Sequence, residues 1–171
     1  MNIQTLLHLF REQESSAYFE ATLLSTLEEI GFPKATMVFM PRSPKLTPAP
    51  PRHISNYPLE WQERYINSNY IQIDPAIIKP LQNPHQLFKW HDRTNLDASE
   101  QLVLNEAAEF DLDIGICVPI DASTGFGIMA LKYDGTAHEL DLFLKDNRAA
   151  LWLLGNAAQY TALSTFHLEY G

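Results

Sequence analysis

Aromatic and acidic side chains are concentrated between Tyr57 and Trp90. Tyr57, Trp61 and Tyr65 are four residues apart, so on a helix their side chains would form one stripe on the same face. Such a stripe usually belongs to a hydrophobic core. Here Asp74 follows the stripe, and buried indole N–H and phenol O–H groups require hydrogen-bond partners. Donors grouped near one carboxylate predict a pocket for a neutral ligand whose polar head resembles an amide.

Catalytic and metal chemistry have weaker support in the sequence. Cys117 is the only cysteine, so it forms no internal disulfide or CxxC zinc site. It could form a nucleophile pair with one of four candidate histidines, His53, His85, His91 and His138. No motif surrounds these residues, and Cys117 alternates within an apolar run, which favours a buried structural cysteine. His85 and His91 are six residues apart, unlike helical metal ligands. We expect no enzyme, no metal and no cofactor.

Composition limits the classes of protein that remain. The 171 residues fit one domain, and a hydrophobic fraction of 46% is enough for a core. A formal charge of −9 disfavours direct binding to nucleic acid, because phosphates would be repelled. No apolar stretch approaches the ~20 residues of a membrane-spanning helix, and Met1 is not followed by a signal-peptide pattern. These features predict a cytoplasmic protein that does not enter a membrane.

Apolar periodicity and end signals locate the expected elements. Helices are predicted over 2–30 (as two helices, or one broken near Ser15), from about residue 57, from Asp74, from Asp97 to 110 and from 139 to 166. Strands are predicted over 35–40, 52–55, 114–120 and 126–133, with a proline-rich loop over 41–51 and a hairpin turn over 121–125. This order predicts an α+β fold, an α-β-α sandwich with a central, mainly antiparallel sheet of about five strands between helical layers. A ligand could lie between the sheet and one layer.

One motif makes this general expectation specific. The pattern Tyr-Pro-x-x-Trp-x-x-x-Tyr-x-x-x-x-Tyr-x-x-x-Asp-Pro runs from Tyr57 to Pro75, and Trp90 and Gly115 follow it. It resembles the autoinducer-binding domain of LuxR-type quorum-sensing transcriptional regulators, which bind N-acyl-homoserine lactones. Gly31, the predicted hairpin and the long last helix extend the resemblance over nearly the whole chain.

The resemblance implies a role for each residue of the motif. Trp61 would donate its indole N–H to the lactone carbonyl, Asp74 would accept from the amide N–H, and Tyr57 would donate to the acyl carbonyl. The walls around the head group would come from three aromatic residues, Tyr65, Tyr70 and Trp90. The acyl chain would lie against the sheet and its neighbours, at Thr36, Val38, Met40, Ile77, Cys117, Phe126, Ile128 and Ala130.

The sequence departs from the family pattern in places. Many relatives carry Ser or Thr at the position of Ala130, and that hydroxyl provides a second hydrogen bond to the ligand carbonyl. In this chain, Tyr57 or a water would have to provide the hydrogen bond alone. The interval from Asp74 to Trp90 is one residue longer than usual. Val38 and Ile128 are bulky for positions that a long chain would pass, which predicts a short or medium acyl chain.

The resemblance also implies partners. Relatives act as homodimers and reach DNA through a C-terminal helix-turn-helix domain, which we expect to be absent from this single sensor domain of residues 1–171. Trp152 lies on an apolar face of the last helix and favours self-association. The alternatives are a PAS- or GAF-like sensor of another small molecule, a short regulator that pairs with a full-length relative, and a lactonase.

Overall fold

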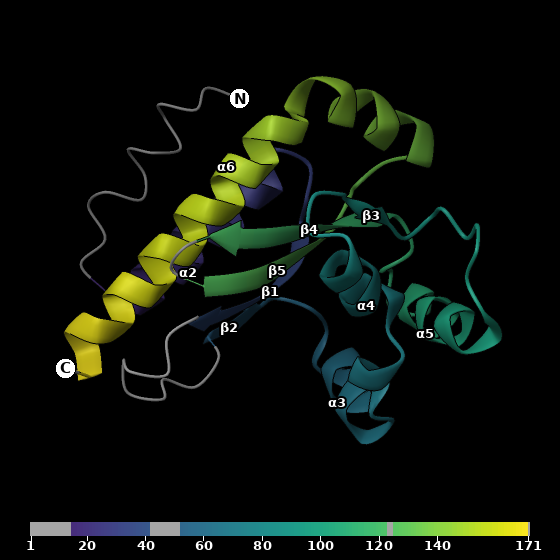
Figure 1. The fold of residues 1–171 in the computed structure, drawn as a ribbon, viewed down its shortest axis with the longest axis horizontal. Helices are drawn as coiled ribbons and strands as arrows, with labels where there is room; N and C mark the ends of the chain where they lie inside the picture. The colour runs from purple at the N-terminus through teal and green to yellow at the C-terminus, as the bar shows by residue number, and fades with distance from the viewer. Residues whose placement is uncertain (1–14, 42–51, 123–124, 171) are drawn as a thin grey trace.

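A five-stranded antiparallel sheet lies between two helical layers in the computed structural model, which describes residues 15–41, 52–122 and 125–170 (Figure 1). The strand order is β2-β1-β5-β4-β3. The strands are β1 (Lys34–Pro41), β2 (Arg52–Ser55), β3 (Phe88–Lys89), β4 (Gly115–Ala122) and β5 (Gly125–Lys132). This arrangement confirms the predicted α+β fold.

The helices divide between the two faces of the sheet. The first layer contains α2 (Ser16–Glu29) and the long α6 (Ala137–Tyr170). The second contains α3 (Leu59–Asn67), the short 3₁₀ helix η1 (Tyr70–Gln72), α4 (Pro75–Gln82) and α5 (Ala98–Ala108). None of the described helices combines the length and apolarity needed to cross a membrane.

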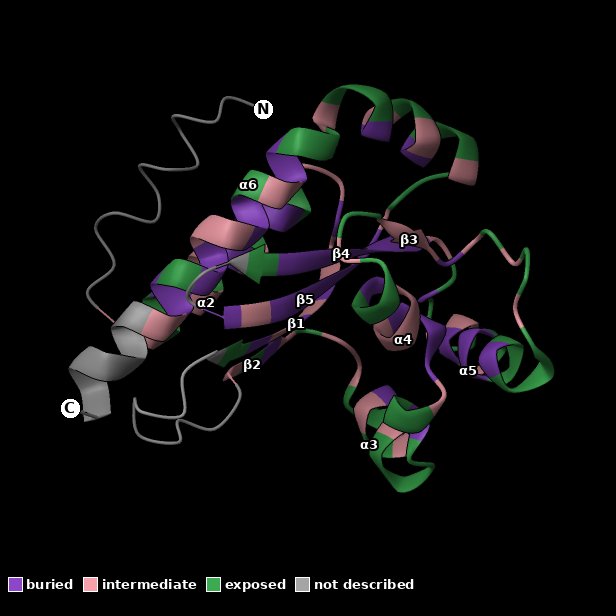
Figure 2. Ribbon diagram, in the orientation of Figure 1, coloured by how far each residue is buried: buried purple, intermediate pink, exposed green. Residues whose placement is uncertain are grey.

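Alternation along the strands separates two hydrophobic clusters. On β1, Met37 and Phe39 point towards α2 and α6, where they pack with Leu23 and Leu151. Side chains at the alternate strand positions point to the opposite face, towards the second layer. Ala130 of β5 is one of them, and it packs in the same cluster as Trp61. Figure 2 shows the central strands as mostly buried, as expected for a sheet covered on both faces.

Local capping explains where the site-bearing helices begin. Asp74 caps α4 by accepting a hydrogen bond from the Ala76 N–H, and Pro75 takes the first helical position. Asp97 and Glu100 form the predicted capping box of α5. These polar signals confirm the predicted starts of both helices.

Several predicted boundaries differ from the structure. Helix α3 begins at Leu59, slightly later than the predicted start near residue 57, and Pro58 is its cap. The pairing of β4 with β5 continues beyond the predicted end of the first strand at residue 120, since Asp121 is still paired with Phe126. Continued pairing satisfies the backbone hydrogen-bonding groups of these residues. Helix α6 begins earlier than predicted, because the Thr136 hydroxyl accepts from the Glu139 N–H and caps it.

Some predictions fall outside the described residues, and two short elements were not predicted. The helix predicted before residue 15 and the proline-rich loop over 42–51 both lie in undescribed parts of the chain. The two-residue strand β3 and the single turn η1 are too short to produce a periodic pattern.

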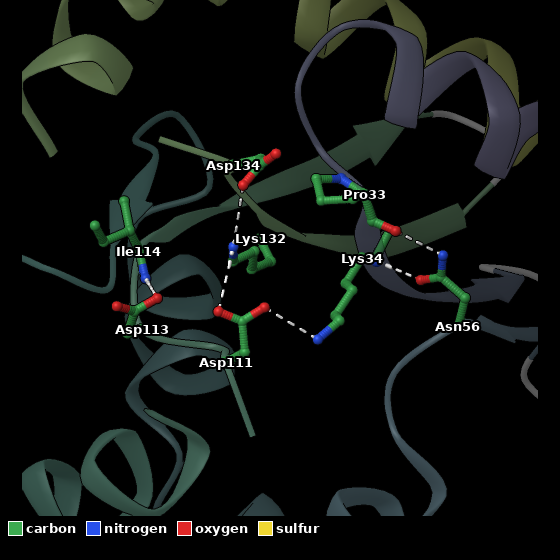
Figure 3. Close-up of polar contacts among 9 residues, drawn as sticks. Pro33, Lys34, Asn56, Asp111, Asp113, Ile114, Lys132 and Asp134 are labelled. Carbon is green, nitrogen blue, oxygen red and sulfur yellow. Dashed lines mark hydrogen bonds and ion pairs between the residues drawn. The ribbon is translucent and has the colours of Figure 1, made fainter. Parts of the chain in front are cut away.

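Polar contacts at one end of the sheet fasten the second layer to the strands (Figure 3). Asp111, just after α5, pairs with Lys34 of β1 at 3.2 Å and with the buried Lys132 of β5 at 3.5 Å. The Asn56 side chain accepts from the Ala35 N–H at 2.7 Å. These contacts position the segments that enter and leave the candidate site.

Candidate functional site

A cavity of about 190 Å³ lies between the sheet and the second helical layer. Nine of the fourteen predicted site residues line it: Thr36, Val38, Tyr57, Trp61, Tyr65, Asp74, Ile77, Trp90 and Ala130. They come from β1, β5, the two helices α3 and α4, and the connections between elements. The tertiary fold therefore brings residues almost 100 positions apart in sequence to the wall of one cavity.

The carboxylate of Asp74 is the charged group in the wall of this cavity. Asp74 is 7% exposed. Its Oδ1 accepts from the Ala76 N–H and its Oδ2 from the Tyr65 hydroxyl, both at 2.8 Å. Burial raises the pKa of Asp74 to about 6, while these two hydrogen bonds oppose the shift. These two hydrogen bonds therefore do not fully offset the desolvation of the carboxylate, and a third hydrogen-bond donor would stabilise its charge.

Tyr57 reaches the cavity from the segment between β2 and α3. Its backbone N–H donates to the Ser55 hydroxyl at 3.2 Å, and its carbonyl accepts from the Gln62 side chain at 2.8 Å. Its hydroxyl donates to the Ala130 carbonyl at 3.3 Å. This last distance is long for a hydroxyl donor, so little is lost if the hydroxyl turns to another acceptor. Burial raises the pKa of Tyr57 and keeps the hydroxyl protonated.

Three aromatic rings pack against one another beside the cavity. Trp61 contacts Tyr65 and Tyr70 with ring centroids 5.7 and 6.0 Å apart, and the two tyrosine rings are also 6.0 Å apart. Tyr70 itself does not line the cavity. It packs behind Trp61 and Tyr65 and thereby restricts their side-chain positions.

Trp90 closes the cavity from the end of β3. Its backbone N–H donates to the Gly115 carbonyl at 3.0 Å, which extends the β3–β4 pairing by one residue. Its six-membered ring lies directly on Gly115, where an added Cβ would be 2.6 Å from ring carbons and 2.3 Å from the Leu131 carbonyl. Glycine is therefore required at this position for Trp90 to occupy its place.

Five predicted residues lie outside the lining. Tyr70 lies behind the aromatic rings, and Cys117 and Ile128 are buried in the cluster beneath the cavity. Met40 is 38% exposed near the end of β1, where it aligns with Phe126 of β5. These two residues share the predicted face of the sheet but are too far along the strands to border the cavity.

The cavity is also lined by residues that the sequence analysis did not assign to a ligand site. They are His53, Ser55, Gln62, Ile66, Ile71, Ala76, Val103, Leu104, Ala107 and Leu112. The positions on α5 follow the ordinary core spacing of an amphipathic helix, which carries no ligand signal. His53 lies on the edge strand, and its Nε2 is 3.0 Å from the Thr36 hydroxyl. Burial lowers the pKa of His53, and proximity to Glu20 opposes this shift.

The surroundings of Cys117 do not support nucleophilic chemistry. Burial raises the pKa of the thiol, and the negative charge of Asp74 raises it further, so the thiolate is disfavoured. Among the described residues, no cluster of three His, Cys, Asp or Glu side chains has a geometry that could hold a metal ion. The arrangement is that of a site for binding a largely apolar molecule with a polar head.

Comparison with known proteins identifies the family of the chain. The model of the family "Autoinducer binding domain" matches residues 17–162. The chain is 31% identical over 97 residues to the transcriptional activator TraR of Rhizobium radiobacter, covering 53% of this chain and 41% of TraR. The first three curated relatives are covered over 39 to 51% of their length, so the chain spans about half of them or less.

Solved structures show the same fold. The LuxR-family transcription factor CepR2 from Burkholderia cenocepacia superposes with a TM-score of 0.73 at 20% identity, covering 96% of this chain and 98% of that one. A solution structure of an Escherichia coli SdiA fragment gives 0.75 at 16% identity, with coverages of 95% and 93%. Because the family model covers most of the chain, the protein belongs to the autoinducer-binding domain family of LuxR-type quorum-sensing regulators, which is not a family of enzymes.

Proposed function

We propose that the cavity binds an N-acyl-homoserine lactone, whose amide N–H donates to the Asp74 carboxylate. The observation that carries this proposal is a buried carboxylate in the wall of an otherwise mainly apolar cavity. Each carboxylate oxygen accepts one hydrogen bond within the protein, and each has capacity for one more. A hydrogen bond to a charged group contributes roughly 1.5–3 kcal/mol, so Asp74 would dominate the polar recognition.

Trp61 and Tyr57 would supply the remaining donors. In this arrangement Trp61 donates its indole N–H to the lactone carbonyl. Tyr57 turns its hydroxyl from the Ala130 carbonyl to the acyl carbonyl. The methyl side chain of Ala130 offers no hydrogen bond of its own, so recognition of the acyl carbonyl depends on Tyr57. Tyr65 would act by holding the Asp74 carboxylate in place.

The acyl chain would extend from this head along β1 towards β2. Thr36 and Val38 form the floor in this direction, and His53 lies beyond them on the edge strand. Ile66 lines the same cavity and is 75% exposed, which marks where the cavity approaches solvent. The bulk of Val38 and the small volume favour a short or medium acyl chain.

Ligand burial would couple recognition to folding and assembly. A molecule that binds only the folded state raises the free energy of unfolding by RT ln(1 + [L]/Kd). Trp152 packs inward and donates to the Pro119 carbonyl, so it does not offer the self-association surface that the sequence suggested. Leu142 and Leu153 are 46% and 48% exposed on α6 and support a homodimer through this helix. DNA binding would belong to a helix-turn-helix segment of a longer protein.

The test is to identify the bound molecule. The chain is expressed in a host that produces several acyl-homoserine lactones, purified, extracted and analysed by mass spectrometry. We expect one lactone to be enriched and the same compound to raise the Tm of the purified chain. The ring-opened acyl-homoserine is the matched control, because its carboxylate would be repelled by Asp74. Absence of any thermal shift across a lactone series would refute the proposal.

A further inference from the structure

Helix α3 forms one wall of the cavity but buries little of its own surface. Four of its residues line the cavity: Trp61, Gln62, Tyr65 and Ile66. Among the nine described residues of α3, Trp61 alone is buried, and the helix lies at the periphery of the molecule (Figure 1). Elements with few buried side chains open at a lower free energy than core elements. This wall of the cavity is therefore suited to move.

Both ends of α3 have features of a hinge. The helix begins after Pro58 without a side-chain cap, whereas Asp74 and Asp97 cap α4 and α5 through their carboxylates. Beyond its last turn, Asn69 has a φ of 53° and a ψ of 39°, in the left-handed region that residues other than glycine seldom adopt. Hinge movements are absorbed by a few residues at the ends of elements. Both ends of α3 therefore allow the helix to swing as a unit.

Arg64 fastens the outer side of α3 to the end of α5. Its Nη1 is 2.7 Å from Glu109 Oε2 and 3.5 Å from Glu106 Oε2. Its guanidinium carbon lies 4.7 Å from the centroid of the Phe110 ring, which in turn is 5.7 Å from the Trp61 ring. Arg64 is not one of the lining residues. It therefore connects two walls of the cavity without bordering the space between them.

Exposed apolar side chains mark the side on which the cavity would open. Ile66 of α3 and Ile71 of η1 both line the cavity, and they are 75% and 54% exposed. An apolar chain arriving from solvent would contact these two residues first. Movement of α3 would also separate the Tyr65 hydroxyl from Asp74 and free a carboxylate oxygen for an incoming donor.

We propose that α3 is a lid that opens to admit the ligand, and that Arg64 is the latch that holds it against α5. The identity of the ligand rests on the proposed function, whereas the movement of α3 does not. Because Arg64 lies outside the lining, its contacts stabilise the closed lid equally with and without ligand. Loss of the latch should then raise the rate constants of association and dissociation by the same factor and leave Kd nearly unchanged.

Stopped-flow mixing with an N-acyl-homoserine lactone, followed by tryptophan fluorescence, measures both rate constants. We expect R64Q to raise both by roughly twofold to tenfold, since exposed ion pairs and cation–π contacts are individually weak. The lactone is neutral, so the lost charge does not itself change the rate of encounter. R148Q is the matched control and should change neither rate, because Arg148 lies 5.0 Å over the Trp152 ring on α6, outside the lining.

A second variant checks that Arg64 acts through its partner. E109Q should raise both rate constants in the same direction as R64Q, and the double variant should add little to R64Q alone. Effects that add fully would mean that the two residues act separately, which would overturn the latch. If R64Q does not fold by circular dichroism, E109Q provides the same comparison with R148Q.

Thiol labelling tests the movement without any ligand. Cys117 is the only cysteine of the chain, so A107C in a C117A background carries a single thiol. Ala107 lines the cavity and is 7% exposed, so a thiol at this position should react with iodoacetamide mainly when the lid is open. We expect addition of R64Q to accelerate labelling by roughly twofold to tenfold and addition of R148Q to leave it unchanged.

The two measurements separate the lid from the identity of its ligand. If the lactone binds but R64Q changes neither rate constant, or raises only that of dissociation, the lid is overturned while the proposed function stands. If no lactone binds, the proposed function fails and thiol labelling decides the lid. Labelling that R64Q accelerates would then support a lid over a cavity for another molecule, and unchanged labelling would overturn it.

Discussion

The Tyr65 hydroxyl donates to Asp74 Oδ2 at 2.8 Å and so connects α3 to the N-terminal cap of α4. Asp74 uses its other oxygen to cap α4 through the Ala76 N–H. One carboxylate therefore holds the local backbone, orders a neighbouring aromatic side chain and faces the cavity. Desolvation of this carboxylate is the cause of its raised pKa.

The D74N variant should retain the fold and lose most of the ligand response. Asparagine is as good a helix cap as aspartate, so α4 is expected to keep its start. Replacing the charged acceptor should weaken lactone binding by about 1.5–3 kcal/mol, or roughly tenfold to a hundredfold. Calorimetric titration measures this loss, and circular dichroism checks the fold. A PAS- or GAF-like mode of recognition predicts no special sensitivity at Asp74, so unchanged affinity would contradict our assignment.

The raised pKa of Asp74 predicts a defined pH dependence of stability. Its folded pKa of about 6 exceeds the ordinary aspartate value of 3.8, so the folded chain binds this proton more tightly than the unfolded chain. The charged carboxylate therefore destabilises the fold above about pH 6, and this penalty disappears as pH falls towards 4. Urea unfolding should show D74N more stable than the parent near pH 7, by up to about 3 kcal/mol, with the difference vanishing near pH 4. A difference independent of pH would rule out a buried charge.

Ligand affinity should change with pH in the opposite sense. The proposed amide hydrogen bond is strongest to the ionised carboxylate, so protonation of Asp74 competes with binding. Below about pH 6, lactone affinity should fall by up to roughly tenfold per pH unit. Titrations between pH 5 and 7.5 measure this, and D74N should give a much flatter profile. A parent profile as flat as that of D74N would argue against the amide contact.

The G115A variant should displace Trp90. An added Cβ would lie 2.6 Å from the indole and 2.3 Å from the Leu131 carbonyl, and the backbone has little freedom to yield. Overpacking of this kind costs about 1–3 kcal/mol, and ligand binding should weaken with it. G135A is the control outside the cavity, because its added Cβ would meet the Tyr133 ring at 2.7 Å and not Trp90. Equal loss of ligand affinity in both variants would argue against a specific role for Gly115.

The V38A variant should change the preferred acyl length. Val38 lines the cavity and aligns with Ile128 across the β1–β5 ladder. Removing two methyl groups enlarges the path of the acyl chain. Thermal shifts across a series of chain lengths should therefore have an optimum at longer chains than in the parent. M40A, outside the lining on the same strand, should leave the optimum unchanged. An affinity in the parent that rises steadily to twelve or more carbons would refute the expected short or medium chain.

Residue types and their spacing predicted most of the fold and several of the residues that line the cavity. Tyr57, Trp61 and Asp74 were identifiable because their spacing and residue types are unusual for a plain core. Helix starts at Asp74 and Asp97 were predictable because capping depends on residues close together in the chain. The division of β1 and β5 residues between the two faces was predictable for the same reason, since successive side chains of a strand point to opposite faces.

Which of these residues border one cavity depends on contacts between distant segments. Met40 and Phe126 follow the correct alternation but lie towards the far end of the strands, a position set by the β1–β5 register. His53 and Leu104 carry no local ligand signal and enter the lining because β2 and α5 pack around the cavity. The position of the Trp90 ring likewise depends on its contact with Gly115, 25 positions away. Periodicity specifies which face a side chain occupies, whereas packing between distant segments specifies what that face encloses.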